Sequence, residues 1–345
     1  MPELLSPLQP PLEVKVQTLC NAAIYPEVVE RVETMETHFA WIFLTEQHAY
    51  KLKKPVRVDR MDHRSLSSRY WSCLEELRLN RRLAPDVYLD VVPLTMDAEG
   101  ELHLGERGSP VEWLVKMRRL KGELLLDHAM TTQSVTPGTI YRVGRLLADF
   151  YCRQPSVQIG PQAYCQRLNE QIESNRRELL APDLLLPSDR VKRVASIQQD
   201  ALKTTSRLLA ERAERGKIIE AHGDLRPEHI YLGYPPCVID CLEFERDLRL
   251  LDPAEELAFL FIECEQAGHA WIGKQVLDVY RTVSGDTFSP ALFQFYSSRR
   301  ATHRAMIIAW HLRDVQVRDN QDWRALAIAY LDKAFEYASH AQQPR

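Results

Sequence analysis

The sequence lacks any stretch long and apolar enough to cross a membrane. A membrane-spanning helix needs about 20 apolar residues in a row, and the most apolar segments of this 345-residue chain are broken by charges such as Glu255, Glu256 and Glu263. The first residues, MPELLSPLQPPLEV, contain four prolines and an early glutamate, whereas a signal peptide needs a basic start and an unbroken apolar run. We therefore expect a soluble, cytoplasmic protein without membrane contacts.

The sequence also lacks the charge and cysteine patterns of two other protein classes. The net charge is -4 and no long block of lysine and arginine occurs, which argues against a nucleic-acid partner. The seven cysteines are scattered, with no C-x-x-C pair, which argues against a disulfide framework or a zinc ribbon. With 45% hydrophobic residues, the chain can build a large core without either.

The first third of the chain predicts strands and one helix. Residues Ala40 to Leu44 (AWIFL) and His48 to Lys53 (HAYKLK) have the composition and alternation of two strands joined by a turn. Helical spacing runs from Leu66 to Leu83, where Ala84-Pro85 stops it. Two further strands are predicted at 89–95 and 111–117, so this part should fold as a mostly antiparallel sheet with one helix.

Beyond Leu120 the pattern becomes mainly helical. Apolar residues recur at helical spacing from Ile140 to Phe150, and long helices are predicted at 162–180 and 188–215. The exceptions are two short apolar segments of β type, Lys217 to Ala221 and Pro236 to Leu242, which flank HGDLRPEHIYLGYPP. A loop bracketed by strands in a helical region is a favourable place for chemistry.

This loop and the first strands contain the groups that phosphoryl transfer requires. The reaction needs a carboxylate for the acceptor hydroxyl, a second carboxylate for magnesium and a cation for the phosphates. Asp224 lies in the loop, and Asp240 is predicted to end the apolar strand after it. Lys51 lies on a predicted strand, and Glu75 or Glu76 lies on the following helix, as an ATP-positioning ion pair would require.

At these residues the sequence resembles the aminoglycoside phosphotransferase and choline kinase superfamily, whose signature is H-G-D-x-x-x-x-N followed by a strand ending in I-D. HGDLRPEHIYL and VIDCLEF match it, and YKLKKP and EELRLNRRLAPDVYLDVVPL extend the resemblance, over residues 37–263, to a bacterial phosphotransferase-like branch. The resemblance implies an α+β, protein-kinase-like fold with two lobes: a nucleotide-binding lobe at 1–117 and a helical lobe at 118–345 with the catalytic loop and the substrate site.

The resemblance also implies residue roles. Asp224 would be the catalytic base, Asp240 a magnesium ligand and Lys51 the lysine that contacts the α and β phosphates, paired with Glu76. Arg226 falls where protein kinases place a lysine near the transferred phosphoryl group, and its guanidinium can bind phosphate oxygens in a bidentate manner.

Several neighbouring residues compete for these roles. Lys53 lies on the same strand face as Lys51, and Glu75 adjoins Glu76, so the ion pair has more than one possible composition. Asp252 matches an aspartate that in this superfamily opens a helix and braces the catalytic loop, although a helix N-cap before proline explains it equally well.

Other positions depart from the family pattern. No glycine precedes Gly100, so the glycine-rich phosphate loop is missing and the turn at 34–38 would take its place. His229 stands where an asparagine is expected. It is either a defect of a second magnesium site, which prefers oxygen ligands, or an adapted residue that binds a softer metal such as manganese or donates a hydrogen bond that holds Asp224 or Asp240. Adenine would meet main-chain groups near Arg118 and Leu120.

We therefore predict an ATP- and magnesium-dependent kinase whose acceptor is a hydroxyl of a small polar metabolite or an aminoglycoside-like molecule. Two alternatives stay open: a catalytically weak pseudokinase that binds nucleotide or a protein, and a kinase for protein substrates. Acidic residues could favour a cationic acceptor, or they could be solvated or paired with Arg246 and Arg249; these are Glu243, Glu245, Asp247, Glu255, Glu256 and Glu263.

Overall fold

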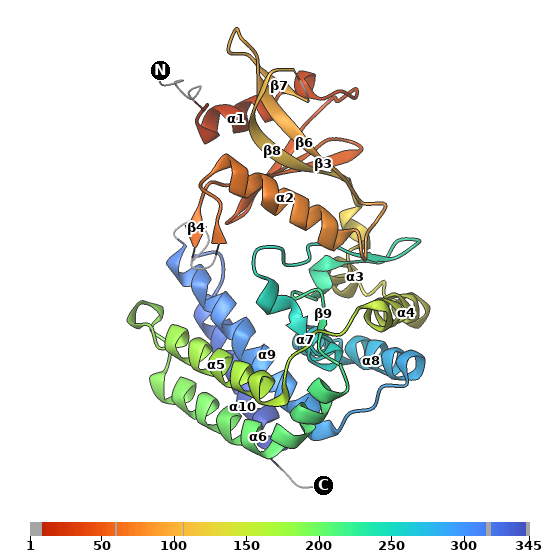
Figure 1. Ribbon diagram of the computed structural model, residues 1–345, viewed down its shortest axis with the longest axis vertical. Helices are drawn as coiled ribbons and strands as arrows, with labels where there is room; N and C mark the ends of the chain where they lie inside the picture. Colours follow the sequence, from red (N-terminus) through yellow and green to blue (C-terminus); the bar gives the residue numbers. More distant parts are fainter. Residues whose placement is uncertain (1–8, 59–60, 106, 315–318, 343–345) are drawn as a thin grey trace. The chain divides into compact units, whose positions relative to one another are not determined.

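The structure is a computed structural model that describes residues 9–58, 61–105, 107–314 and 319–342. The chain forms two compact units, each built from two segments (Figure 1). The first unit comprises Met1–His128 and Tyr231–Asp247, and the second comprises Ala129–Ile230 and Leu248–Arg345. The predicted division into a nucleotide-binding lobe at 1–117 and a substrate lobe at 118–345 concerns function and stays a prediction.

The first unit is built on a six-stranded antiparallel sheet with the strand order β1-β2-β3-β8-β6-β7. The second and third strands have the predicted bounds, and β6 and β8 extend slightly beyond theirs. The strands are β1 (Glu33–Glu36), β2 (Ala40–Leu44), β3 (His48–Lys53), β6 (Tyr88–Met96), β7 (Leu102–Leu104) and β8 (Ser109–Arg118). Helix α1 (Leu12–Leu19) and the strands β1 and β7 were not predicted.

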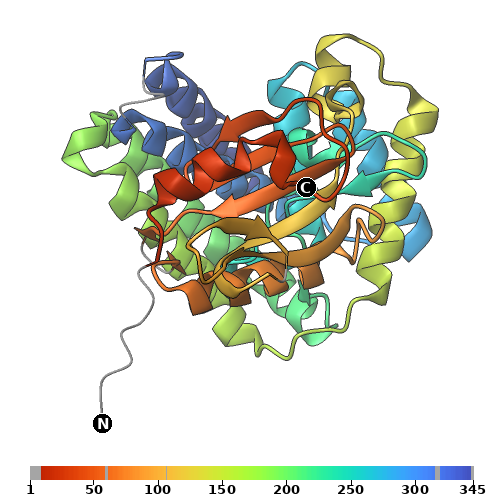
Figure 2. The ribbon, with the colours of Figure 1, turned by 90° about the horizontal axis from the view of Figure 1, so that it is seen from above.

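Alternation along the strands buries both faces of this sheet. Successive strand residues point to opposite faces, and Leu114 and Val115 of β8 accordingly belong to different core clusters. On one face Leu114 packs with residues of α1, which lies across the sheet in Figure 2. On the other face Val115 packs with Cys73 and Leu77 of helix α2 (Leu66–Asn80). The β8 region of the sheet is therefore covered on both sides.

Local sequence explains where α2 begins and ends. The Ser65 side chain caps the helix by accepting a hydrogen bond from the Ser68 N–H. The helix ends at Asn80, three residues before the predicted end at Leu83, and a turn leads to Ala84-Pro85. A proline restricts the residue before it to extended conformations, so the helix cannot continue.

The remaining elements of this unit are short. They are β4 (Arg57–Val58), β5 (Met61–Asp62), η1 (Ala22–Ile24) and η2 (Gly122–Leu124), and β11 (Cys237–Val238) lies in the returning segment. Helix α3 (Leu126–Thr131) and strand β10 (Ile230–Tyr231) lie where the chain passes between the units. The strand predicted at 236–242 is therefore only the two residues of β11.

The second unit is mainly helical, as predicted. Helices α5 and α6 match the predicted ranges within one residue. The helices are α4 (Pro137–Arg153), α5 (Pro161–Leu179), α6 (Ser188–Glu214), α7 (Pro253–Gln266), α8 (Ala270–Ser284), α9 (Pro290–Trp310) and α10 (Trp323–Ala341), with η3 (Pro182–Leu184), η4 (Pro227–His229) and η6 (His311–Arg313). The short helix η5 (Arg246–Arg249) lies where the chain passes from the first unit to the second. Strands β9 (Ile219–Glu220) and β12 (Leu250–Leu251) pair in antiparallel fashion, so the strand predicted at 217–221 is shorter than expected.

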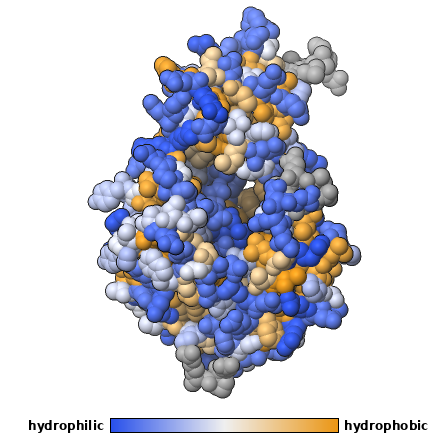
Figure 3. Space-filling model, turned by 180° about the vertical axis from the view of Figure 1, so that it is seen from behind, coloured by the Kyte–Doolittle hydropathy of each residue, from blue (hydrophilic) through white to orange (hydrophobic). Residues whose placement is uncertain are grey.

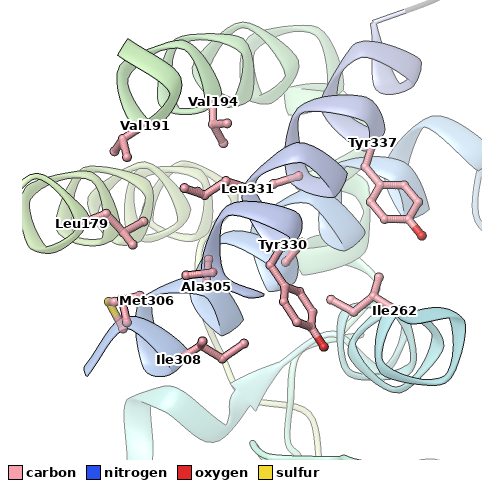
Figure 4. Packing of buried hydrophobic residues seen from close by; sticks show 14 of the residues in the cluster. Leu179, Val191, Val194, Ile262, Ala305, Met306, Ile308, Tyr330, Leu331 and Tyr337 are labelled. Carbon is pink, nitrogen blue, oxygen red and sulfur yellow. The ribbon is translucent and has the colours of Figure 1, made fainter. Parts of the chain in front are cut away.

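The core of the second unit lies between its long helices. Leu179 of α5, Val191 and Val194 of α6, Ile262 of α7 and Leu331 of α10 are all buried there, and Figure 4 shows them converging around α9 and α10. Burial of this apolar surface is the main favourable term in folding. It fixes α7, which carries several carboxylates discussed below.

The surface of the molecule and its thiols add two observations. The face in Figure 3 mixes hydrophilic and hydrophobic residues, and within the described ranges no helix combines the length and apolarity needed to span a bilayer. All seven cysteines carry free thiols.

Candidate active site

The first group of candidate residues lies between β3 and α2 in the first unit. The Lys51 Nζ atom is 2.9 Å from Glu76 Oε1, and the Lys53 Nζ atom is 2.5 Å from Glu76 Oε2. The Glu76 side chain is fully buried. By contrast, Glu75 pairs with Arg78 on the exposed side of the helix. The structure thus brings Glu76, and not Glu75, together with Lys51.

Lys51 and Lys53 differ in their second partners and in exposure. Two residues apart on a strand, they point to the same face. Lys51 Nζ also lies 2.8 Å from Asp240 Oδ1, and its side chain is 16% exposed. Lys53 pairs with Glu243 and is only 2% exposed. The Lys51 side chain is therefore the more exposed of the two, and its second partner, Asp240, is more exposed than Glu243.

Asp240 does not end a strand as predicted, because β11 ends at Val238 and the chain turns after it. Its backbone has a φ of 60°, in the left-handed region, which aspartate tolerates better than most residues. The Asp240 N–H donates to Tyr88 Oη (3.0 Å) and the Cys241 N–H donates to Asn80 Oδ1 (2.8 Å). The turn leaves the Asp240 carboxylate 47% exposed.

The charges in this group keep one another ionised. Burial alone would raise the pKa of Glu76, but the charges of Lys51 and Lys53 hold it below its usual range. Burial likewise opposes the charge on Lys51, yet Asp240 and Glu76 raise its pKa well above the ordinary value. Both lysines therefore stay cationic, as phosphate binding requires.

The second group lies in the HGD loop of the second unit, and a buried carboxylate of α7 supports it. Gly223 has a φ of 92°, which glycine adopts without strain. Glu256 accepts hydrogen bonds from the N–H groups of His222 (3.1 Å) and Gly223 (2.6 Å) and from the Tyr151 hydroxyl (2.8 Å). The bent loop before Asp224 is thus fixed to α4 and α7.

Asp252 does not make this bracing contact. Its side chain caps α7 by accepting from the Ala254 N–H (2.9 Å), and both of its oxygens lie 2.6 Å from nitrogens of Arg212. Its other partner is the Tyr296 hydroxyl (3.0 Å). The contact with the HGD loop is instead made by Glu256, four residues further along the chain.

Asp224, Arg226 and His229 lie close together in the loop. Arg226 Nη2 is 3.0 Å from Asp224 Oδ2, and Arg226 Nη1 is 2.5 Å from Glu228 Oε1. His229 Nδ1 lies 2.8 Å from the main-chain oxygen of Asp224, so an N–H at Nδ1 donates to it. His229 Nε2 then faces Arg226 Nη2 at 3.4 Å. The ring is therefore held by its own loop.

The surroundings of Asp224 favour its ionised form. Burial would raise the pKa of this carboxyl, but electrostatic interactions with His229, Arg226, His222 and Arg304 hold that pKa below its usual range. An ionised carboxylate can accept a hydrogen bond from a hydroxyl group.

The structure bears on the metal and nucleotide predictions as well. In the part of the chain that the structure describes, no group of three or more His, Cys, Asp or Glu side chains could hold a metal by itself. Magnesium, however, takes oxygen ligands and usually keeps waters besides one or two carboxylates and the substrate phosphates. The half-exposed Asp240 carboxylate fits a magnesium ion of that kind.

The residues predicted to meet adenine and phosphate lie in the first unit. Arg118 ends β8, and its N–H donates to the Val87 oxygen at 2.8 Å, while Leu120 packs on the cluster around Val115. Most of the turn predicted at 34–38 is strand β1, and the turn itself follows Glu36. It is closed by a hydrogen bond from the Thr37 N–H to the Ala40 oxygen (2.8 Å).

The acidic residues considered for a cationic acceptor have mostly internal partners. Glu255 pairs with Arg299 at 2.6 Å and with Arg300 at 3.3 Å. Glu263 accepts from the Tyr330 hydroxyl (2.8 Å) and lies 3.3 Å from Arg304. With Glu256 bound to the HGD loop, these three carboxylates of α7 are buried and engaged.

A comparison of the sequence with family models decides the family. The model described as the phosphotransferase enzyme family matches residues 61–296, more than half of the chain. The chain belongs to this family. Its matched region contains α2, the HGD loop, Asp240 and the carboxylates of α7, so most of the groups described above lie within it.

Curated relatives of this phosphotransferase-family chain are longer. Uncharacterized proteins from Mycobacterium bovis and Mycobacterium tuberculosis are 30% identical to it over 284 residues, covering 80% of this chain and 54% of each relative. The chain therefore spans about half the length of the curated relatives it matches.

Similar solved structures are kinases. A choline/ethanolamine kinase family protein from Mesorhizobium loti has a TM-score of 0.53 at 16% identity, covering 95% of this chain and 98% of that one. A choline kinase from Cryptosporidium parvum Iowa II has a TM-score of 0.55 at 10% identity, covering 95% of both chains. A glucosamine kinase has a TM-score of 0.51 at 14% identity, covering 96% of this chain and 80% of that one. The predicted kinase-like α+β fold is confirmed.

Sequence reasoning missed several residues that organise these groups. Asn80 follows Glu76 by one helical turn, a spacing that places both on one face of α2. Glu256 lies four residues after Asp252, again on one face. Tyr88 and Glu243 gave no comparable signal, because their contacts join segments far apart in the sequence.

Proposed function

We propose that this chain transfers the γ-phosphoryl group of ATP to a hydroxyl group of a small polar molecule. Membership of a phosphotransferase family supports this reaction. The observation that carries the proposal is the contact of Lys51 with both Glu76 and Asp240. This contact places the Lys51 ammonium group, which can bind phosphate, beside the half-exposed Asp240 carboxylate, which can bind a metal ion.

In the first unit we assign the nucleotide roles. Lys51 binds the α and β phosphates, Glu76 holds Lys51, and the half-exposed Asp240 carboxylate is the magnesium ligand. When bound, magnesium neutralises charge on the phosphates. Main-chain groups near Arg118 and Leu120 are proposed to meet the adenine. The exposure of the Asp240 carboxylate and of Lys51 supports these roles.

In the second unit we assign the acceptor roles. Asp224 accepts the proton of the acceptor hydroxyl or orients that hydroxyl, because it is ionised and partly exposed. Arg226, at 3.0 Å from Asp224, stabilises the charge on the transferred phosphoryl group. His229 is proposed to hold the Asp224 backbone through its Nδ1–H. Its alternative role as a metal ligand is less well supported, because both ring nitrogens face groups of the loop.

The decisive experiment is an assay of ATP-dependent phosphorylation with the purified chain. A panel of hydroxylated metabolites, amino sugars and aminoglycosides is tested beside generic protein acceptors, with magnesium present. We expect transfer to a small molecule and its loss in Asp224→Asn. The matched control is Asp200→Asn, which removes an exposed carboxylate paired with Lys203 on α6.

Three outcomes would contradict the proposal. Phosphoryl transfer only to protein acceptors would show that the substrate is a protein and not a small molecule. Nucleotide binding without any transfer would favour a binding module. Equal activity of Asp224→Asn and Asp200→Asn would show that the Asp224 carboxylate has no part in the reaction.

A further inference from the structure

The segment after Asp240 makes a second contact with β3, between Glu243 and Lys53. The roles proposed above assign no function to this ion pair. Glu243 pairs with Lys53, and both side chains are largely buried, with 12% and 2% exposure. A buried lysine with a carboxylate partner is uncommon, because removing two charges from water is costly unless the geometry is good. Lys53 has a second partner in Glu76, at 2.5 Å.

These contacts form a continuous chain of alternating charge. Asp240 pairs with Lys51, Lys51 with Glu76, Glu76 with Lys53, and Lys53 with Glu243. Glu76 uses a different oxygen for each lysine. The segment 240–243 is thus joined at both ends, through two lysines of one strand, to the same buried glutamate.

The backbone of this segment needs such support. Asp240 has a φ of 60°, which a residue other than glycine keeps only where its surroundings favour it. Strand β11 ends at Val238, so strand pairing does not hold Asp240. The hydrogen bonds to Tyr88 Oη and Asn80 Oδ1 fix the N–H groups of residues 240 and 241, and the Glu243 side chain is fixed by Lys53.

We propose that Lys53 and Glu243 are positioning residues that hold the Asp240 segment in the conformation in which Asp240 binds magnesium on the nucleotide. The inference rests on the proposed nucleotide-binding function. Lys53 also pairs with the Glu76 oxygen that Lys51 does not use, so that Glu76 keeps a cationic partner when Lys51 contacts phosphate.

The test measures nucleotide binding rather than turnover. Calorimetry with a non-hydrolysable ATP analogue, with and without magnesium, gives the gain in affinity that the metal confers. Loss of a group that orients a metal ligand typically lowers metal affinity about 10- to 100-fold. We expect Glu243→Gln and Lys53→Met to reduce the magnesium-dependent gain by that order, with little change in affinity when magnesium is absent.

Two controls separate positioning from general damage. Lys203→Met removes an exposed lysine that pairs with Asp200 on α6, and should leave the magnesium-dependent gain unchanged. The double variant should lose no more than the larger single loss, because Lys53 and Glu243 act as one unit. Glu243→Asp keeps the charge on a shorter side chain and should show a smaller loss, and it replaces Glu243→Gln if that variant does not fold.

The outcomes distinguish this inference from the proposed function. A wild-type chain that binds no nucleotide under either condition would refute the proposed function and the inference together. A wild type with a clear magnesium-dependent gain, fully retained in Glu243→Gln or in Lys53→Met, would overturn the inference alone. Additive losses in the double variant would also overturn it, because they would show two independent effects.

Discussion

The buried position of Glu76 between two lysines leads to a strong prediction for the stability of the chain. Its oxygens lie 2.9 Å from Lys51 Nζ and 2.5 Å from Lys53 Nζ, and the side chain is fully buried. In Glu76→Gln the shape is nearly kept, but the carboxylate that compensates both ammonium groups is lost. Removing one partner of a buried ion pair costs about 3–5 kcal/mol, a large share of the ~5–15 kcal/mol that stabilises a typical domain.

The assay is urea-induced unfolding followed by fluorescence, with Glu75→Gln as the matched control. Glu75 precedes Glu76 on the same helix, but it pairs with Arg78 at the surface. Exposed ion pairs contribute only about 0–1 kcal/mol, so the control should unfold almost like the wild type. Equal unfolding midpoints for Glu76→Gln and Glu75→Gln would refute the reasoning, because burial and double pairing would then have no energetic consequence.

The pH dependence of the same difference has a definite sign. The lysine charges hold the pKa of Glu76 below its usual range in the folded state. A group with a lowered folded pKa contributes stability above its unfolded pKa, and that contribution is lost as the pH falls through the folded pKa. The stability gap between the wild type and Glu76→Gln should therefore be constant near neutral pH and narrow only in acid.

Three further predictions concern activity and binding. Asp224→Asn should lower kcat by about 10²- to 10⁴-fold, as for loss of a general base, and leave nucleotide affinity nearly unchanged; steady-state rates with full retained activity would exclude that role. Asp240→Ala should lower nucleotide affinity and turnover together in the presence of magnesium. Calorimetry showing wild-type nucleotide affinity in this variant would count against Asp240 as a magnesium ligand. His229→Asn should reduce activity with magnesium, because the Nδ1–H that holds the Asp224 oxygen is lost; a variant faster than the wild type with both magnesium and manganese would instead identify the histidine as a defect.

The predictable parts of the fold are those with a strong local pattern. Strands β2 and β3 are rich in apolar and aromatic residues and are buried or half-buried along their whole length, and their predicted bounds match the structure. Strand β1, with the sequence ETME, is exposed along its whole length, so no apolar alternation marks it. It forms because its main chain pairs with β2. Such a strand depends on a neighbour that is already in place, and its own residues do not reveal it.

The site divides in the same way, into residues marked by a local motif and residues whose partners are distant in the sequence. Asp224 and Asp240 belong to short motifs, so the sequence alone makes them candidates. The choice between Glu75 and Glu76 depends on which side of α2 faces the sheet, and that is set by packing. The pairing of Lys53 with Glu243 joins residues 190 positions apart, and local spacing contains no information about such a partner.

Three acidic residues of α7 bear on whether the acceptor is a cation. In the sequence, Glu255, Glu256 and Glu263 could equally be a surface that attracts a cation or a set of structural carboxylates. In the fold, arginines of α9, the HGD loop and Tyr330 engage them. A carboxylate already compensated by a buried partner adds little attraction for a further cation. These three carboxylates therefore give no reason to favour a cationic acceptor, and neutral and anionic hydroxyl compounds belong in the acceptor panel beside the aminoglycosides.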